Sequence, residues 1–99
     1  GITTVDLSAE GKWCVAKPTA TNAVLQENID YACSHVDCSL IKPSGVCYEP
    51  TSLISQASVA MNLYYQATGK MDFACDFKGS GLVVIGDPSY GSCKFEFRH

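Results

Sequence analysis

The chain has 99 residues, of which 17% are charged, and its formal net charge at pH 7 is -3. This length suits one small domain with one core, and is too short for a core beside a separately folded catalytic domain. Lysine and arginine occur singly rather than in runs, so the chain lacks the basic surface that nucleic acid or an anionic membrane requires. Neither is expected as a partner.

The start of the chain carries no pattern of a targeting or membrane segment. No apolar run approaches the ~20 residues that span a bilayer, and GITTVDLSAEGKW lacks the charged-then-apolar order of a signal peptide. We therefore expect a mature protein or an excised domain. Residues 1–11 have no strong period and are predicted to be an arm or linker, with the folded module over residues 12–99.

Six cysteines are dispersed along the chain, an even number that indicates three disulfides and secretion into an oxidising compartment. Zinc binding is the alternative, but the sequence has no C-x-x-C pair and only two histidines. One of these, His35, lies between two cysteines and reads as a solvated turn residue rather than a ligand. No metal ion and no cofactor is expected.

The first helix is predicted from about Asn22 to Ser34. Pro18 disfavours helix before it, and Thr21 can serve as the N-cap by accepting a backbone N–H. Apolar residues recur with the helical period along one face and predict a core-facing stripe, formed by Leu25, Ile29, Ala32 and Val36.

Residues 33–50, rich in cysteine, proline and glycine, are predicted to be a loop pinned by a disulfide. A second helix follows Pro50, with Thr51 or Ser52 as cap, and ends at Gly69. The runs FACDF, GLVVIG and CKFEF then predict two or three short antiparallel strands.

Two adjacent tyrosines in MNLYYQ raise the question of which one faces outward. At about 100° per residue, Tyr64 falls on the stripe of Leu53, so it is predicted to be core. Tyr65 falls on the shoulder of the helix, and Asn62 and Gln66 fall further round toward the polar side. The expectation is an exposed ring beside two amides.

Catalytic patterns are absent from the sequence. The ten acidic residues are dispersed, with no pairing that singles out the two carboxylates of a glycosidase. There is no G-x-S-x-G motif, and neither histidine has an obvious nucleophile beside it. No catalytic residue is assigned.

Five tyrosines, four phenylalanines and one tryptophan stand in a chain of low charge. Aromatic faces stack on the C–H face of a sugar ring, and neighbouring amides and carboxylates bind its hydroxyls. The alternative is that the aromatic residues fill the core, and that reading is favoured for Trp13 and the phenylalanines.

Several motifs carry a resemblance to a known family: WCVAK, LQENIDYAC, DCSLI, GVCYEP, ASVAMNLYYQATGK, ACDF and DPSYGSCKF. In this order and spacing they resemble carbohydrate-binding module family 43, the plant β-1,3-glucan-binding domain of some endo-β-1,3-glucanases, plasmodesmal callose-binding proteins and pollen allergens. The similarity covers about residues 12–95. It departs from the pattern at Val59, at Met61 and in GLVVIG, which replaces a more polar stretch.

The resemblance implies a small α+β disulfide-rich domain, with two packed α-helices, a small antiparallel β-sheet and long coils. It also implies three pairings: Cys14 with Cys75, Cys33 with Cys38, and Cys47 with Cys93. The implied function is non-catalytic binding of β-1,3-glucan by a secreted monomer of the plant cell wall, sometimes linked to a glucanase domain.

The candidate carbohydrate-binding residues combine the exposed-tyrosine prediction with this implied ligand. They are four tyrosines and four polar partners, namely Tyr31, Tyr48, Tyr65, Tyr90, Gln26, Asn62, Gln66 and Asp76. Two alternatives stay open, namely docking to a glucanase domain or another cell-wall protein through the same surface, and weak hydrolysis.

Overall fold

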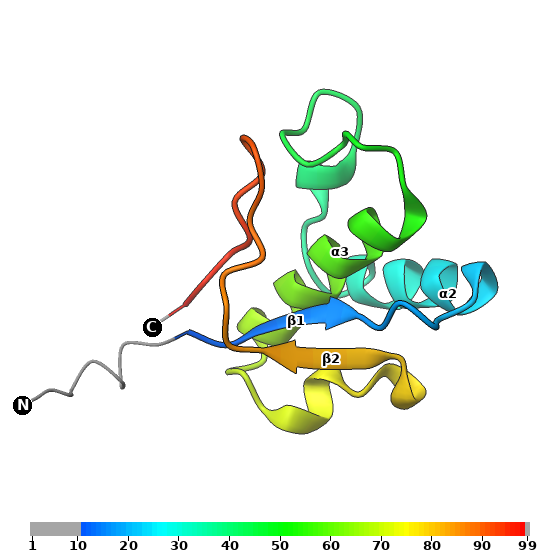
Figure 1. Cartoon of the computed structure of the whole chain (residues 1–99), viewed down its shortest axis with the longest axis vertical. Helices are drawn as coiled ribbons and strands as arrows, with labels where there is room; N and C mark the ends of the chain where they lie inside the picture. Colours follow the sequence, from blue (N-terminus) through cyan, green and yellow to red (C-terminus); the bar gives the residue numbers. More distant parts are fainter. Residues whose placement is uncertain (1–10, 99) are drawn as a thin grey trace, which may run out of the picture.

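A computed structural model describes residues 11–98 of the chain. In chain order the elements are β1 (Trp13–Ala16), α2 (Asn22–Cys33), α3 (Leu53–Ala67) and β2 (Gly81–Val84), with the short 3-10 helices η1 (Ser39–Ile41), η2 (Asp72–Cys75) and η3 (Phe77–Gly79). The predicted arm lies outside the described residues except for Gly11, which is buried. The predicted fold class is confirmed: two helices, a small antiparallel sheet and disulfide-linked coils (Figure 1).

Both predicted helices are confirmed, with their caps. The side-chain hydroxyl of Thr21 accepts the backbone N–H of Val24 at the start of α2. At the start of α3, Ser52 rather than Thr51 is the cap, and it accepts the N–H of Ser55. After α3, Gly69 takes the left-handed conformation with φ 84°, which ends the helix.

The strand prediction is right for GLVVIG and wrong for the other two runs. β2 pairs with β1, in the register Trp13↔Val84 to Ala16↔Gly81, and β1 itself was not predicted because four residues carry little pattern. FACDF instead forms turns of 3-10 helix, and between residues 93 and 97 the described chain has only an isolated bridge from Tyr90 to Cys93.

Helix α3 is the centre of the fold, since it packs against both α2 and β1 (Figure 1). One buried cluster gathers Trp13, Val59, Leu63 and Phe95 between α3, β1 and the C-terminal segment. A second gathers Leu25, Met61, Tyr65 and the Cys14–Cys75 bridge between α3, α2 and η2. The sequence thus encodes one helix that is buried on more than one face.

A stripe of polar side chains on α3 faces β1 instead of solvent. The N–H of Ala16 donates to Ser58 Oγ at 2.9 Å, and the N–H of Cys14 donates to Asn62 Oδ1 at 3.0 Å. One helical turn on, Gln66 Nε2 donates to the carbonyl of Lys12 at 2.8 Å. These side chains provide hydrogen-bond partners for backbone groups on the edge of β1 that does not pair with β2. A third strand would provide them in a larger sheet.

The same stripe also holds the end of the chain. Asn62 Nδ2 donates to the carbonyl of Glu96 at 2.8 Å, and the N–H of Arg98 donates to Gln66 Oε1 at 2.9 Å. The C-terminal coil therefore lies against α3 without forming a strand.

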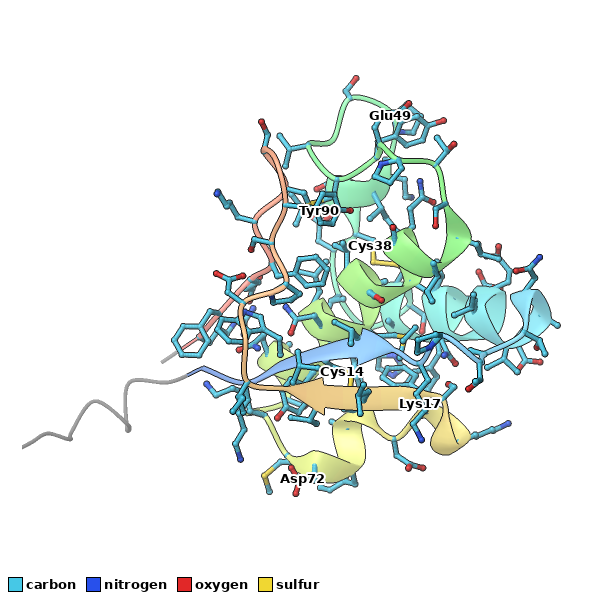
Figure 2. All side chains as sticks on the ribbon, in the orientation of Figure 1. Cys14, Lys17, Cys38, Glu49, Asp72 and Tyr90 are labelled. Carbon is cyan, nitrogen blue, oxygen red and sulfur yellow. A yellow bond between two sulfur atoms is a disulfide. The ribbon has the colours of Figure 1, made fainter. Side chains whose placement is uncertain are left out.

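The three disulfides pair as the resemblance implies: Cys14–Cys75, Cys33–Cys38 and Cys47–Cys93, with no free cysteine among the described residues (Figure 2). They close loops with sequence separations of 61, 5 and 46 residues. At the start of β2, the backbone of Gly81 lies so close to Cys75 that a Cβ there would stand 1.7 Å from its carbonyl oxygen. Only glycine fits beside this bridge.

Replacing both cysteines of one bridge by serine should destabilise the domain according to the length of the loop that the bridge closes. In the chain-entropy model, loss of Cys47–Cys93 costs about 4 kcal/mol and loss of Cys33–Cys38 about 2 kcal/mol. Urea unfolding of the two double variants measures both values. Equal losses would show that local packing, and not loop length, decides the contribution of these bridges.

Asn62→Ala should reduce the free energy of unfolding by about 3 kcal/mol, because it leaves the buried N–H of Cys14 and the carbonyl of Glu96 without partners. Gln26→Ala is the matched control: Gln26 is an exposed amide bonded only to Asp30, and its loss should change stability by less than about 0.5 kcal/mol. A stable Asn62→Ala variant would contradict the structural role of the polar stripe.

Candidate functional site

An aromatic groove of about 600 Å³ lies where α2, the second half of α3 and the segment η2–η3 meet. This volume is in the range of about 300–1,000 Å³ that is typical of small-molecule sites. Its aromatic lining comes from Tyr31 on α2, Tyr64 on α3, Phe73 on η2 and Phe77 on η3. Three parts of the chain that are distant in the sequence, α2, α3 and the segment η2–η3, thus contribute the rings.

The rings of Tyr31, Tyr64 and Phe77 contact one another edge to face. Tyr31 and Tyr64 have centroids 5.3 Å apart, and their hydroxyls share a hydrogen bond of 3.2 Å. The Phe77 ring lies 5.9 Å from Tyr64, and His35 lies 4.6 Å from Tyr31 on the side of α2. The hydrogen bond with Tyr31, with burial as a smaller cause, raises the pKa of Tyr64 above its ordinary value.

Two of these rings offer large free surfaces. Phe73 is 76% exposed and Tyr31 is 49% exposed, although large aromatic side chains are usually buried. The groove therefore presents apolar ring faces to solvent, which is the arrangement that stacks on the C–H face of a sugar.

Charged groups stand at the same groove: Glu27 on α2, and Asp76 and Lys78 around η3. The two carboxylates accept hydrogen bonds and the ammonium donates them, whereas a sugar hydroxyl does both. All three side chains are exposed, so they remain solvated until a ligand arrives.

Of the predicted site residues, the structure brings Tyr31 and Asp76 together in this groove. Gln26 is exposed on α2 but does not line the groove, and its amide donates to Asp30 at 3.0 Å.

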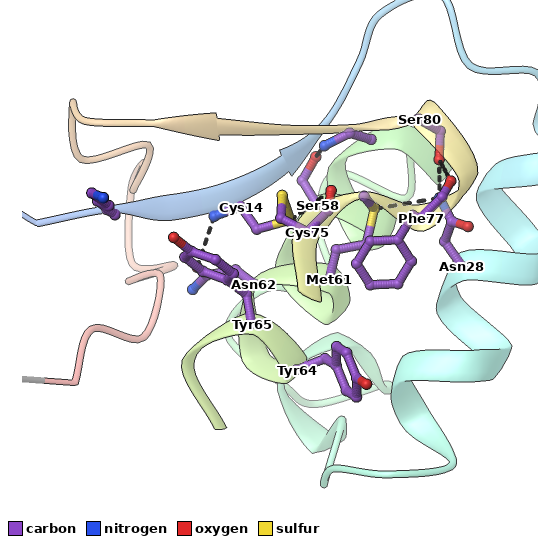
Figure 3. The surroundings of a disulfide bond; sticks show 12 residues. Cys14, Asn28, Ser58, Met61, Asn62, Tyr64, Tyr65, Cys75, Phe77 and Ser80 are labelled. Atoms are coloured by element: carbon purple, nitrogen blue, oxygen red, sulfur yellow. Dashed lines mark hydrogen bonds between the residues drawn. A yellow bond between two sulfur atoms is a disulfide. The ribbon is translucent and has the colours of Figure 1, made fainter. Parts of the chain in front are cut away.

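Three predicted residues are inside the fold, and the helical assignment of the tyrosine pair is wrong. Tyr65 is 0% exposed, Asn62 is 1% exposed and Gln66 is 2% exposed, because β1 and the C-terminal segment cover that face of α3. Tyr64, predicted to be core, is only partly buried and lines the groove. Figure 3 shows the two rings leaving α3 on different sides, Tyr64 toward Phe77 and Tyr65 toward the sheet. Burial, with the charge of Asp72 as a smaller cause, raises the pKa of Tyr65.

Tyr90 and Tyr48 lie apart from the groove. Tyr90 lines a smaller hollow of about 210 Å³ with Phe95, and its buried hydroxyl has no hydrogen-bond partner within residues 11–98. Tyr48 is partly buried, lines neither hollow, and its carbonyl accepts from Gln56. The four candidate tyrosines therefore do not form one surface.

Sequence reasoning missed Glu27, Tyr64, Phe73, Phe77 and Lys78 as groove residues. The phenylalanines were expected in the core, since nothing in FACDF distinguishes an exposed ring from a buried one. Their only sequence signal is the density of aromatic residues around Cys75.

No group of three or more histidine, cysteine, aspartate or glutamate side chains within residues 11–98 could hold a metal ion. In the same range no helix is long and apolar enough to cross a bilayer.

Comparison with known proteins gives the family. The model of the X8 domain matches residues 12–82. A glucan endo-1,3-beta-glucosidase of Triticum aestivum is 57% identical over 88 residues, which are 89% of this chain and 19% of that protein. The major pollen allergen Ole e 10 of Olea europaea is 51% identical over 86 residues, 85% of this chain and 70% of the allergen. Glucan endo-1,3-beta-glucosidase 7 of Arabidopsis thaliana is 44% identical over 84 residues.

The chain spans about a fifth of the length of the wheat glucanase, and a similar region makes up most of the allergen. The X8 domain is a non-catalytic carbohydrate-binding module, and it accounts for only part of the glucanase relatives. On the match over residues 12–82 and these relatives, the chain belongs to the X8 domain family, carbohydrate-binding module family 43.

Proposed function

We propose that the chain binds β-1,3-glucan, such as callose or laminarin, in the aromatic groove. The observation that carries the proposal is the grouping of exposed Phe73 and Tyr31 with the partly buried Tyr64 in one groove. The names of the glucanase relatives support the choice of glucan, since those proteins act on 1,3-linked chains.

The groove offers both interactions that a neutral sugar needs. Ring faces of Tyr31 and Phe73 stack on glucose, and the excluded water makes the contact favourable. Glu27, Asp76 and Lys78 then bind the hydroxyls at the edge of the same sugar. The groove is open, so it accommodates part of a long polysaccharide.

Binding takes place without hydrolysis. Glu27 and Asp76 share the groove, but a glycosidase needs one carboxylic acid whose proton is retained through burial. Both side chains are exposed, so neither carboxylate of the groove is a buried one. We infer that a monomer acts outside the cell, in the cell wall or at plasmodesmata, where three disulfides are stable.

Phe73→Ala should weaken laminarin binding by about 1–2 kcal/mol through loss of a stacking ring, as other aromatic recognition contacts do. Because Phe73 is 76% exposed, its removal should leave the melting temperature nearly unchanged. Ile85→Ala, at an apolar position that is 67% exposed outside the groove, is the control and should bind as the parent chain does.

Titration of laminarin into isotope-labelled protein measures both the affinity and the amide shifts. Shifts at Tyr31, Tyr64 and residues 73–78 are expected. Absence of any shift would refute glucan binding, and shifts restricted to the hollow at Tyr90 would refute the choice of groove. Release of reducing ends from laminarin by the isolated chain would refute the non-catalytic assignment.

A second candidate function is docking to a linked glucanase domain, and one observation favours it. Leu82 on β2 is 43% exposed and Ile85 just after β2 is 67% exposed, so two large apolar side chains reach solvent at this strand. Single exposed apolar residues are common, but a partner that covers both would turn this exposure into an interaction surface.

Adding the isolated catalytic domain of a plant glucan endo-1,3-beta-glucosidase tests this second candidate. Docking should shift the amides of residues 81–86 and leave those of the groove unchanged, and Leu82→Ser with Ile85→Ser should abolish the effect. Identical spectra with and without the catalytic domain would refute docking in trans.

A further inference from the structure

Three successive residues beside the groove have left-handed backbone conformations. Phe77, Lys78 and Gly79 have φ values of 43°, 56° and 87°. Glycine adopts this region freely, but side chains with a Cβ disfavour it, and a bulky phenylalanine disfavours it strongly. Strained backbone of this kind concentrates at functional sites, where the surrounding structure holds it in place.

Hydrogen bonds to buried side chains hold this turn. Ser80 donates from its hydroxyl to the carbonyl of Phe77 at 2.7 Å and from its N–H to the same carbonyl at 3.1 Å. Asn28 Nδ2 on α2 donates to Ser80 Oγ at 2.8 Å (Figure 3). Asn28 and Ser80 are both buried, so this contact ties the turn to the helix that carries Tyr31.

The turn directs three consecutive side chains to one side, since Asp76, Phe77 and Lys78 all line the groove. A regular strand would point alternate side chains to opposite faces. The Phe77 ring lies 5.9 Å from Tyr64 and 6.3 Å from Tyr31, so it packs against both tyrosines, while the charged Asp76 and Lys78 flank it in the sequence.

Among the described residues that line the groove, Lys78 carries the positive charge. Its ammonium makes no hydrogen bond or ion pair with any residue of the range 11–98. The oxygens of sugar hydroxyls and ring ethers accept hydrogen bonds, whereas an ammonium only donates. The unpaired ammonium therefore complements the acceptors Glu27 and Asp76 across the aromatic lining.

We propose that Lys78 is a specificity-determining residue of the groove, which donates to hydroxyl oxygens of the bound sugar, and that Asn28 and Ser80 are positioning residues that hold its left-handed turn. This inference rests on the proposed glucan binding. It assigns the backbone strain at Phe77 and Lys78 to ligand recognition. A substitution that relieves this strain and removes the ammonium should therefore stabilise the folded domain but weaken glucan binding.

Two replacements of Lys78 separate the backbone from the charge. Lys78→Gly relieves the left-handed strain and removes the ammonium, so its melting temperature should rise by about 4 °C while laminarin affinity falls about tenfold. Lys78→Met keeps the strain and the length of the side chain, so it should lose the same affinity with an unchanged melting temperature.

Ser44→Gly is the matched control for strain. Ser44 is an exposed loop residue with φ 82° outside the groove, so glycine there should raise the melting temperature without changing the affinity for laminarin. Calorimetric titration and thermal unfolding give both quantities for all variants.

Ser80→Ala tests the positioning role at a temperature where the variant is fully folded. A purely structural Ser80 would lower the melting temperature and leave the affinity of the folded protein unchanged. A positioning Ser80 should also lower that affinity and shift the ring resonances of Phe77.

Parental affinity in both Lys78 variants would overturn the role of Lys78, and parental affinity in folded Ser80→Ala would overturn the positioning role. A melting temperature of Lys78→Gly at or below that of the parent would overturn the assignment of strain, whatever the ligand does. Failure of the parent chain itself to bind laminarin would instead refute the proposed function, and with it the ligand assigned to Lys78.

Discussion

The fold depends on the hydrogen bonds between α3 and the unpaired edge of β1. A two-stranded sheet leaves backbone groups of both strands without partners, and such groups are costly when they are buried. Ser58, Asn62 and Gln66, spaced four residues apart along α3, supply the missing partners for residues 12–16. A domain with little β-structure thereby covers one edge of its only described sheet with a helix.

This interaction decides how α3 is rotated about its axis, and so decides which tyrosine is exposed. Because the polar stripe faces β1, the neighbouring Tyr65 enters the core beside the Cys14–Cys75 bridge. Tyr64, one position earlier, is turned toward α2 and meets Tyr31 at the groove. On α3 the amide side chains of Asn62 and Gln66 are thus buried, while the ring of Tyr64 is partly exposed. This is the reverse of the usual relation between polarity and burial.

The groove is built from segments that are brought together by covalent and hydrogen-bonded links. Cys75 separates Phe73 from Phe77, and its bridge to β1 fixes the chain on both sides of it. The contact between Asn28 and Ser80 ties the turn after it to α2. Exposed aromatic rings gain nothing for the stability of the free domain, so the links that hold them in place are consistent with a ligand that covers them. Membership in the X8 family agrees with the carbohydrate proposed above as this ligand.

Local signals in the sequence determined the two helices, the cap Thr21, a choice between Thr51 and Ser52 for the second cap, and the glycine that ends α3. These features depend on a few neighbouring residues. The resemblance of seven spaced motifs to a known family implied the family and its disulfide pairing, and both are confirmed. Two of the eight candidate binding residues, Tyr31 and Asp76, line the groove. The burial of Tyr65, Asn62 and Gln66 could not be found in this way, because helical periodicity gives the angles between side chains but not which face meets a sheet. Only the tertiary structure decided that, since the partners of the amides are backbone groups of residues 12–14 and of the C-terminal segment, 32 to 54 residues away in the sequence.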